Sequence, residues 1–474
     1  MTQLAEDRQT GIAHSKGIHL ANFSRHFATG EKQSAVVAHP WLDDLRKRSI
    51  ARFDSVGFPT TKQEDWRQTN VNAIAKTPFK LAGKPKDGSA IEHARCFGFA
   101  DEAACELVFV NGRYEPQLSR LGKLLRGLKV VSLASAMPTP QATEIRDHLG
   151  KYADINANPF VALNSGFIDD GAFIRVPRGI HMEAPIHLLF ISTADGGEPT
   201  VSHPRVLVVA EDNTEFSFVE SYIGASGGEG AGAYFTNAVT ELVIGENCAV
   251  DHCKVQHETD DAYHVGTMQV RIGRSSTFVS HSASLGAKLA RNDLNVIFAG
   301  EFAEATLNGI VLLDGTRHCD NHTLLDHALP NCPSHELYKH VLKGKSTGVF
   351  RGKILVRPDA QKTDSKQTSK SLLLSDDAYM NSQPALEIYA DDVKCTHGST
   401  TGPVDEEMVF YLRSRGVGAE AARHLLTYAF AADITRRIRI SPVRRLLEDY
   451  MAQQAGLPQD LRITDLGHHD EASR

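Results

Sequence analysis

Short β-type runs, each followed by a polar or glycine-containing turn, recur between about residue 160 and residue 400 and restrict the folds open to this chain. Successive turns lie about 27 to 44 residues apart, which is too irregular for a propeller or a leucine-rich repeat. Coils of a β-solenoid tolerate loop insertions of this kind. The runs that set the pattern are 173–179, 205–212, 239–245, 268–273, 295–300 and 338–344.

A second alternating run follows most of these turns, as at 215–220 and 277–281. No long helical segment separates the runs, which disfavours a sheet built from βαβ units. On pattern alone, a β-sandwich remains the alternative to a solenoid. We therefore expect a mainly β protein, with the solenoid slightly favoured.

Helical patterning flanks the β-rich part on both sides. A segment that begins at Pro40 spaces Leu42, Leu45, Ile50 and Phe53 about one helical face, and a short β run with an Asn-Gly turn follows at 105–114. After Gly402 the chain predicts helices over 403–416 and 419–438 and a third from residue 441. The expected domains are 1–155, 156–400 and 401–474.

Composition excludes several classes of protein. The formal net charge of −7 argues against a nucleic-acid binder. The first residues show no basic segment followed by an apolar one, and no run approaches 18 apolar residues, so we expect neither export nor a membrane span. The seven cysteines are scattered without a CxxC pair, as expected of reduced thiols in a cytoplasmic protein without a self-contained zinc or iron–sulfur site.

Cys395 and His397 form the most informative pair in the chain. They follow a strand-like run at 386–392 and precede a glycine and a Ser/Thr-rich turn, and we place them in the polar turn that ends that run. If the strand period of two persists through them, both side chains lie on one face and can reach one metal or sulfur atom. An iron–sulfur cluster normally takes four ligands, so a site built from this pair needs a partner chain or exchangeable ligands. A structural role and a Cys–His nucleophilic pair stay open as alternatives.

Two other features have ordinary explanations. The fragment Gly344-Lys-Ser-Thr347 lacks the glycine five residues earlier that a phosphate-binding loop needs, since Lys339 stands there, and we interpret it as a turn. Nine of the 22 histidines lie between His252 and His340. They either bind iron or zinc or stack and hydrogen-bond within the solenoid, and their spacing does not decide between the two.

Several long motifs carry a resemblance to a known family. They are QKTDSKQTSKSLLLS at 361–375, PALEIYADDVKCTHGST at 384–400, FYLRSRG at 410–416 and the separate GFPTTKQEDW at 57–66. Together they resemble the SufD branch of the SufB/SufD family, which serves iron–sulfur cluster assembly in the Suf system. The resemblance implies a right-handed parallel β-helix core flanked by N-terminal and C-terminal α-helical regions.

The resemblance also implies partners. A SufB subunit would pair with this chain through the β-helices, and the SufC ATPase would dock on the C-terminal helices, from about Asp405 to Ile438. The important histidine of the family's Cys-x-His-Gly motif falls on His397, and the preceding cysteine falls on Cys395. We therefore expect His397 and Cys395 as metal ligands of a transient iron–sulfur cluster at the SufB interface, with no cofactor bound stably by this chain alone. A homodimer of the isolated chain is a further expectation.

The expected function is thus that of a non-enzymatic scaffold subunit in a SufB–SufC–SufD complex. The alternative from another class is a β-helix enzyme that acts on polysaccharide. Such enzymes normally have clustered carboxylates or a calcium site in a groove, and commonly an export signal. Neither a convincing acidic cluster nor an export signal is visible in this sequence.

Overall fold

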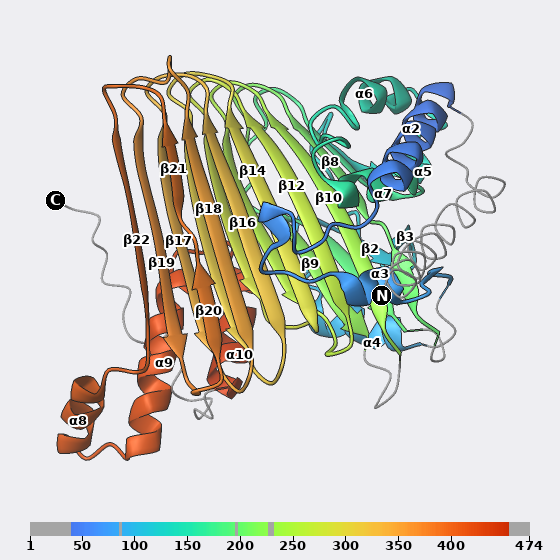
Figure 1. Ribbon diagram of the computed structural model, residues 1–474. Coiled ribbons are helices and arrows are strands. Elements are labelled where there is room, and N and C mark those ends of the chain that lie inside the picture. The colour runs from blue at the N-terminus through green and yellow to red at the C-terminus, as the bar shows by residue number, and fades with distance from the viewer. Residues whose placement is uncertain (1–38, 85–87, 195–197, 226–231, 455–474) are drawn as a thin grey trace, which may run out of the picture.

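The computed structural model describes residues 39–84, 88–194, 198–225 and 232–454 and shows a long two-sheet body with helices at both ends (Figure 1). The helices are α2 (Pro40–Val56), the 3₁₀ turn η2 (Glu64–Trp66), α3 (Asn72–Lys76), α4 (Ser89–Phe97), α5 (Leu133–Ala136), α6 (Gln141–His148), α7 (Pro159–Gly166), α8 (Glu406–Ser414), α9 (Ala419–Thr435) and α10 (Ser441–Gln454).

The strands form one sheet of twelve strands and one of ten. The twelve-strand sheet contains β1 (Lys80–Leu81), β4 (Lys129–Ser132), β5 (Gly171–Val176), β7 (Thr200–Ser202), β8 (Arg205–Ala210), β10 (Tyr234–Ile244), β12 (Tyr263–Ile272), β14 (Leu289–Phe298), β16 (His318–His327), β18 (Thr347–Val356), β20 (Tyr379–Ser382) and β21 (Ala385–Ile388). The ten-strand sheet contains β2 (Cys105–Val110), β3 (Arg113–Tyr114), β6 (Ile186–Thr193), β9 (Glu215–Ala225), β11 (Ala249–His257), β13 (Thr277–Ser284), β15 (Glu304–Leu313), β17 (Pro333–Leu342), β19 (Asp364–Leu373) and β22 (Lys394–Gly402).

The chain passes alternately through the two sheets, so that from β10 to β18 each strand pairs in parallel with the strands two places before and after it. This is a parallel β-solenoid of about seven turns. The mainly β fold with a parallel β-helix core between helical regions is therefore confirmed, and the β-sandwich alternative is wrong because neighbouring strands run parallel rather than antiparallel.

Residues at the same position of successive turns lie side by side, and we call each such set a row. The inward-facing members of the first turns, such as Leu188, Val206 and Val208, are fully buried and apolar. Toward the last turns polar residues join them, and Glu336 and Gln367 are buried between the sheets. The solenoid is thus filled by an apolar core that becomes polar at its C-terminal end.

Most of the helices predicted from sequence are present. The segment from Pro40 forms α2, and the 105–114 run forms β2 and β3 around Asn111 and Gly112, both at positive φ. The helix expected over 419–438 ends earlier, at Thr435, because the backbone tightens there: Arg437 and Ile438 donate to carbonyls three residues back. β2 lies beside β6, so residues before 155 also contribute to the sheets. The boundaries between the three expected domains stay predictions.

The C-terminal helices α9 and α10 fold back along the outer face of the ten-strand sheet. Lys339 of β17, almost fully buried, fastens α9 to this face. Its ammonium pairs with Asp433 at 2.8 Å, donates to the carbonyl oxygen of Phe430 at 2.9 Å and lies 4.5 Å from the centre of the Phe430 ring. The helices are therefore tied to a strand only two places from the end of the sheet.

A fully buried ion pair attaches the N-terminal helical region to the twelve-strand sheet. The Arg205 guanidinium donates to Glu241 at 2.5 Å, and neither side chain is exposed. The same carboxylate accepts the backbone N–H groups of Gly150, Tyr152 and Ala153 at 2.8 to 3.0 Å. Removal of the carboxylate would leave the guanidinium and three amides without it in a site closed to water.

We expect Glu241→Ala to lower the free energy of unfolding by about 3–5 kcal/mol, since breaking a buried pair leaves an uncompensated charge. The matched control is Glu198→Ala, which removes the exposed pair with Lys80 and should cost less than about 1 kcal/mol. Urea unfolding followed by circular dichroism measures both. Equal losses in the two variants would show that the buried pair does not anchor this region.

Candidate functional site

β22 is the last strand of the ten-strand sheet and has one free edge. In the part of the chain that the structure describes, it pairs with β19 alone. Every residue from Thr396 to Thr401 is exposed, whereas alternate residues of β19 are buried. A strand of this kind presents unpaired backbone N–H and C=O groups and its side chains to an incoming chain.

Cys395 and His397 both lie within β22, not in a turn. The prediction that they occupy a polar turn after the 386–392 run is wrong. The strand over that run, β21, ends at Ile388, and the chain crosses to the other sheet before β22 begins. Lys362 holds the connecting turn, since its backbone N–H donates to the carbonyl oxygen of Asp392 and its ammonium pairs with the Asp392 carboxylate. The Ser/Thr-rich residues that follow, up to Gly402, continue the strand.

The period of two does persist through the pair. Cys395 lies opposite Ser365 and His397 lies opposite Gln367. Ser365 and Gln367 are each 1% exposed and face the interior of the solenoid, so the sulfur and the imidazole share the inward face of the terminal strand. The structure thus places the two predicted site residues on one face at the open end of the β-helix.

The two side chains differ in their surroundings. Cys395 is half-buried and packs against the solenoid core. Burial, together with the Asp364 carboxylate, raises the pKa of its thiol. Binding of a metal there must therefore displace a proton. His397 is exposed at the end of the molecule, so its ring is open to a partner.

Buried polar groups stand directly behind the pair. Gln367 donates from Nε2 to Oε2 of Glu336 at 2.5 Å. Ser365 Oγ lies 2.7 Å from Ser334 Oγ, which lies 3.0 Å from Nε2 of His327. Sequence reasoning included His327 among the histidines between His252 and His340 but gave no role to the other four residues. Their signal was the scarcity of apolar residues along 334–340 and 365–371, since the inward positions of a strand are normally apolar.

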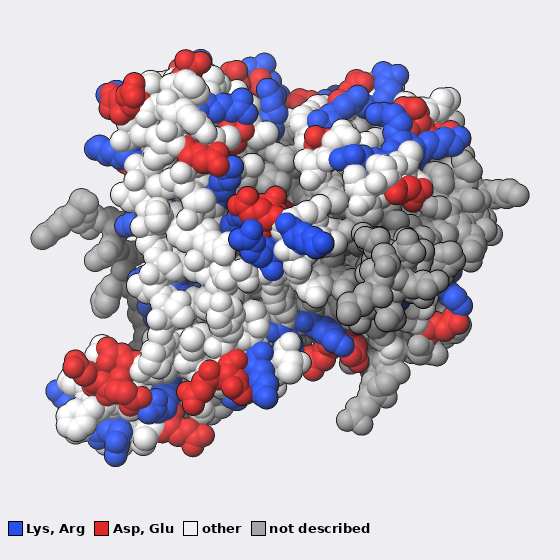
Figure 2. All heavy atoms as spheres, viewed as in Figure 1, with Lys and Arg blue, Asp and Glu red and all other residues white. Residues whose placement is uncertain are grey.

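The helix that follows β22 carries an exposed apolar surface. Asp405 caps α8 by accepting the N–H groups of Glu407 and Met408. Among the described elements, α8 packs chiefly against α9, and it projects below the last strands at the C-terminal end of the solenoid (Figure 1). Figure 2 shows acidic and basic side chains gathered on this projecting lobe, while the sheet face above it is mostly uncharged. The apolar surface of α8 and α9 comprises Met408, Phe410, Tyr411 and Leu425, which are 37 to 70% exposed.

The comparison with family models covers most of the chain. Residues 190–430 match the model described as "SUF system FeS cluster assembly, SufBD core domain", and residues 19–188 match "SufBD protein N-terminal region". The chain belongs to the SufBD family.

Curated relatives agree with this SufBD assignment. The chain is 32% identical to an iron–sulfur cluster assembly SufBD family protein of Synechocystis, over 85% of this chain and 89% of the relative. It is 30% identical to the iron–sulfur cluster assembly protein SufD of Escherichia coli, over 81% and 86%. The SufD protein of Bacillus subtilis is 26% identical over 86% and 92%. This SufBD chain is accordingly an iron–sulfur cluster assembly protein with SufD homologues, and the match favours that function over polysaccharide chemistry.

The histidine-rich part of the SufBD chain does not form one site. His252, His264, His327 and His340 lie inside the solenoid, and burial holds the pKa of each below its usual range. Within the described ranges, no group of three or more His, Cys, Asp or Glu side chains is arranged to hold a metal ion. Most of these histidines instead stack or hydrogen-bond, as His327 does on Phe298 with ring centres 4.2 Å apart.

One histidine cluster lies on the outer face of the twelve-strand sheet and fixes the N-terminal motif to it. Thr69 lies 2.9 Å from Nε2 of His318 and donates to Asp320 at 2.5 Å. Asp320 also pairs with Arg291 at 3.0 Å, and the Arg291 guanidinium lies 3.7 Å from the ring centre of Trp66. These contacts fasten Trp66 of the GFPTTKQEDW motif, and the nearby Thr69, to strands β14 and β16 of the SufBD core.

The interpretation of Gly344 to Thr347 as a turn agrees with the structure. The segment joins β17 to β18, and Gly344 adopts a φ of 66°, which glycine accepts without strain. Its N–H donates to Ser375 on the next turn of the solenoid at 2.9 Å. The amide is therefore occupied by the protein itself.

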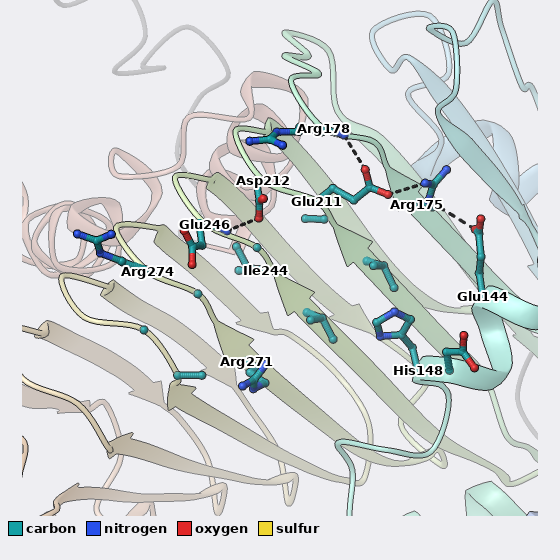
Figure 3. Close-up of a pocket in the computed structure, with 18 of the residues that line it drawn as sticks. Glu144, His148, Arg175, Arg178, Glu211, Asp212, Ile244, Glu246, Arg271 and Arg274 are labelled. Atoms are coloured by element: carbon teal, nitrogen blue, oxygen red, sulfur yellow. Dashed lines mark hydrogen bonds and ion pairs between the residues drawn. The ribbon is translucent and has the colours of Figure 1, made fainter.

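A hollow of about 700 Å³ lies at the rim of the SufBD solenoid, between α6 and the turns that follow β5, β8, β10 and β12 (Figure 3). Its arginines alternate with carboxylates. Arg175 pairs with Glu211 at 2.5 Å and with Glu144 at 3.5 Å, and the Asp212 carboxylate accepts the backbone N–H of Glu246. This hollow lies over the early turns, away from β22, and takes no part in the predicted site.

No helix among the described residues is long and apolar enough to cross a membrane.

Glu336 makes stability depend on pH. Burial raises the pKa of its carboxyl from 4.5 to about 7, so the folded chain keeps this proton up to about pH 7 whereas the unfolded chain releases it near pH 4.5. Stability therefore falls as pH rises from about 4.5 to 7. A glutamine at position 336 has no proton to release, so the Glu336→Gln variant should avoid this loss. We expect its free energy of unfolding, relative to wild type, to rise by up to about 3 kcal/mol between pH 5 and pH 8. Urea unfolding at the two pH values measures the gain, and a constant difference between the proteins would contradict it.

Proposed function

We propose that this chain is a non-enzymatic scaffold subunit of a SufB–SufC–SufD complex, in which β22 supplies half of a site for a nascent iron–sulfur cluster. The observation that supports this most directly is the position of Cys395 and His397, which share one face of an exposed terminal strand with a free edge. The cluster is the cargo of the assembly.

The donor set explains why a second subunit is needed. A thiolate and an imidazole are suitable ligands for iron, but an iron–sulfur cluster normally takes four protein ligands. In the described part of the chain no third metal-binding side chain joins this pair. The remaining ligands would come from SufB, whose β-helix would extend the solenoid where β22 now ends it. A site divided between two chains can open and release its cargo when the chains separate.

The SufC ATPase would dock on the apolar surface of α8 and α9. β22 ends at Gly402 and the α8 cap, Asp405, follows three residues later, so the cluster strand and the ATPase surface are nearly continuous in the chain. Exposed Phe410 and Tyr411 on a short helix with charged neighbours fit a protein interface, because aromatic residues are enriched at such surfaces.

His397→Ala tests the cluster role. In the complex co-expressed with SufB and SufC, we expect at least about a tenfold drop in iron and acid-labile sulfide, as ligand loss commonly weakens metal sites by that much or more. His335→Ala is the control, because His335 is also exposed but lies on the outer face of β17. If the His397→Ala complex accumulates cluster and rescues a deletion strain as well as wild type, His397 is not a ligand.

Phe410→Asp tests the docking role. An aspartate at this position, where the side chain is 70% exposed, should leave the fold intact but reduce capture of SufC by the tagged chain at least tenfold. Phe302→Asp serves as control, since Phe302 is 51% exposed on a turn of the solenoid outside the proposed surface. Isothermal titration with purified SufC gives the affinities. Unchanged binding by Phe410→Asp would show that SufC does not dock on the surface around Phe410.

A further inference from the structure

We propose that Gln367 is a positioning residue for His397: its buried side-chain oxygen accepts the N–H of the imidazole and thereby selects which ring nitrogen is free for the cluster. The inference deepens the proposed function and rests on it for its biological meaning. The structure does not contain this hydrogen bond. Both residues belong to this chain, so the bond can be tested in the isolated protein.

The three groups concerned occupy one row. Glu336 of β17 lies opposite Gln367 of β19, which lies opposite His397 of β22. Residues in register on parallel strands point to the same face, and neighbouring strands are about 4.8 Å apart. His397 is therefore the next side chain in the row after the Gln367 amide.

Glu336 sets the direction of that amide. Nε2 of Gln367 donates to Oε2 of Glu336 at 2.5 Å. An ionised carboxylate only accepts hydrogen bonds, so above the titration range of Glu336 the NH₂ end of the amide must face it. The oxygen end of the amide is then free to accept a hydrogen bond from the next residue in the row, His397.

That oxygen has no partner in the structure. Oε1 of Gln367 is buried and accepts no hydrogen bond from any described residue, although Gln367 is only 1% exposed. A buried polar atom normally has a partner, so an unsatisfied acceptor at a proposed site needs an explanation. The imidazole of His397 is the next donor along the row.

Space for this arrangement is built into the facing sheet. At Gly352 of β18 a Cβ atom would come within 2.1 Å of Nε2 of Gln367. Only glycine admits the Gln367 side chain in its present position.

A fixed tautomer matters because a ligating imidazole nitrogen must be unprotonated. Metal-binding histidines usually donate their other N–H to a carbonyl or carboxylate, and loss of that partner typically weakens binding 10- to 100-fold. With one nitrogen held by Gln367 on the inward side, the other faces the free edge where the partner would bind. Gln367 would thus prepare His397 before any cluster arrives.

The test compares Gln367→Leu with a reversed pair. Gln367→Leu removes the acceptor. The double variant Glu336→Gln, Gln367→Glu exchanges the two groups, so that the new amide at position 336 donates to the carboxylate at position 367, whose second oxygen again faces His397. Ser369→Ala is the control, since Ser369 is the next inward residue of β19 and is equally buried.

The readout is the His397 tautomer in the isolated full-length chain at pH 8, from long-range ¹H–¹⁵N correlations of ¹⁵N-histidine-labelled protein assigned with His397→Gln. We expect one tautomer in wild type, in Ser369→Ala and in the reversed pair, and a mixture in Gln367→Leu. The co-expressed complex of Gln367→Leu should hold about tenfold less iron, with recovery in the reversed pair.

The outcomes separate the two proposals. A single tautomer in Gln367→Leu identical to that of wild type would overturn the role of Gln367, whatever the iron content. If the tautomer responds as expected while His397→Ala leaves cluster content unchanged, the hydrogen bond is real and the cluster role of His397 fails.

Discussion

In-register stacking of parallel strands is the interaction on which the rest of the structure depends. Each turn of the solenoid places its residues directly over those of the turn before, so that rows of side chains run the length of the molecule. An isolated turn cannot bury its own apolar face, and stacking supplies the missing half. The same geometry decides what lies behind any residue: the side chain beneath His397 is Gln367, and beneath that is Glu336.

A row must end, and its end differs chemically from its interior. Cys395 and His397 are the last members of rows whose earlier members are buried. His397 is exposed and Cys395 only half-buried because no further turn follows. Buried polar groups beneath them would destabilise the core of an ordinary solenoid. Here the polar groups lie beneath the residues proposed to hold a cluster, where they can orient those residues.

Much of the fold, and part of the candidate site, could be predicted from the sequence alone. The alternating runs indicated a solenoid, and the Cys-x-His spacing indicated a shared face, because both depend on the local period of a strand. The place of Cys395 in β22 could not be predicted, since the crossing between sheets after Ile388 is set by which strand of the previous turn is free to pair. The Gln367–Glu336 contact was out of reach for the same reason: it joins residues 31 positions apart, and register is a property of the whole stack.

The return of α9 and α10 along the ten-strand sheet has a consequence for the length of the molecule. α9 packs mainly on β15 and β17, toward the C-terminal end of the ten-strand sheet. Lys339 holds it near the last turns, while Arg445 of α10 pairs with Glu102 beside the first. A solenoid could otherwise gain or lose a turn at little cost, as repeat proteins do. The two helices therefore limit the number of turns in the solenoid. A chain with one more turn would lose either the Lys339 contacts or the Arg445–Glu102 pair.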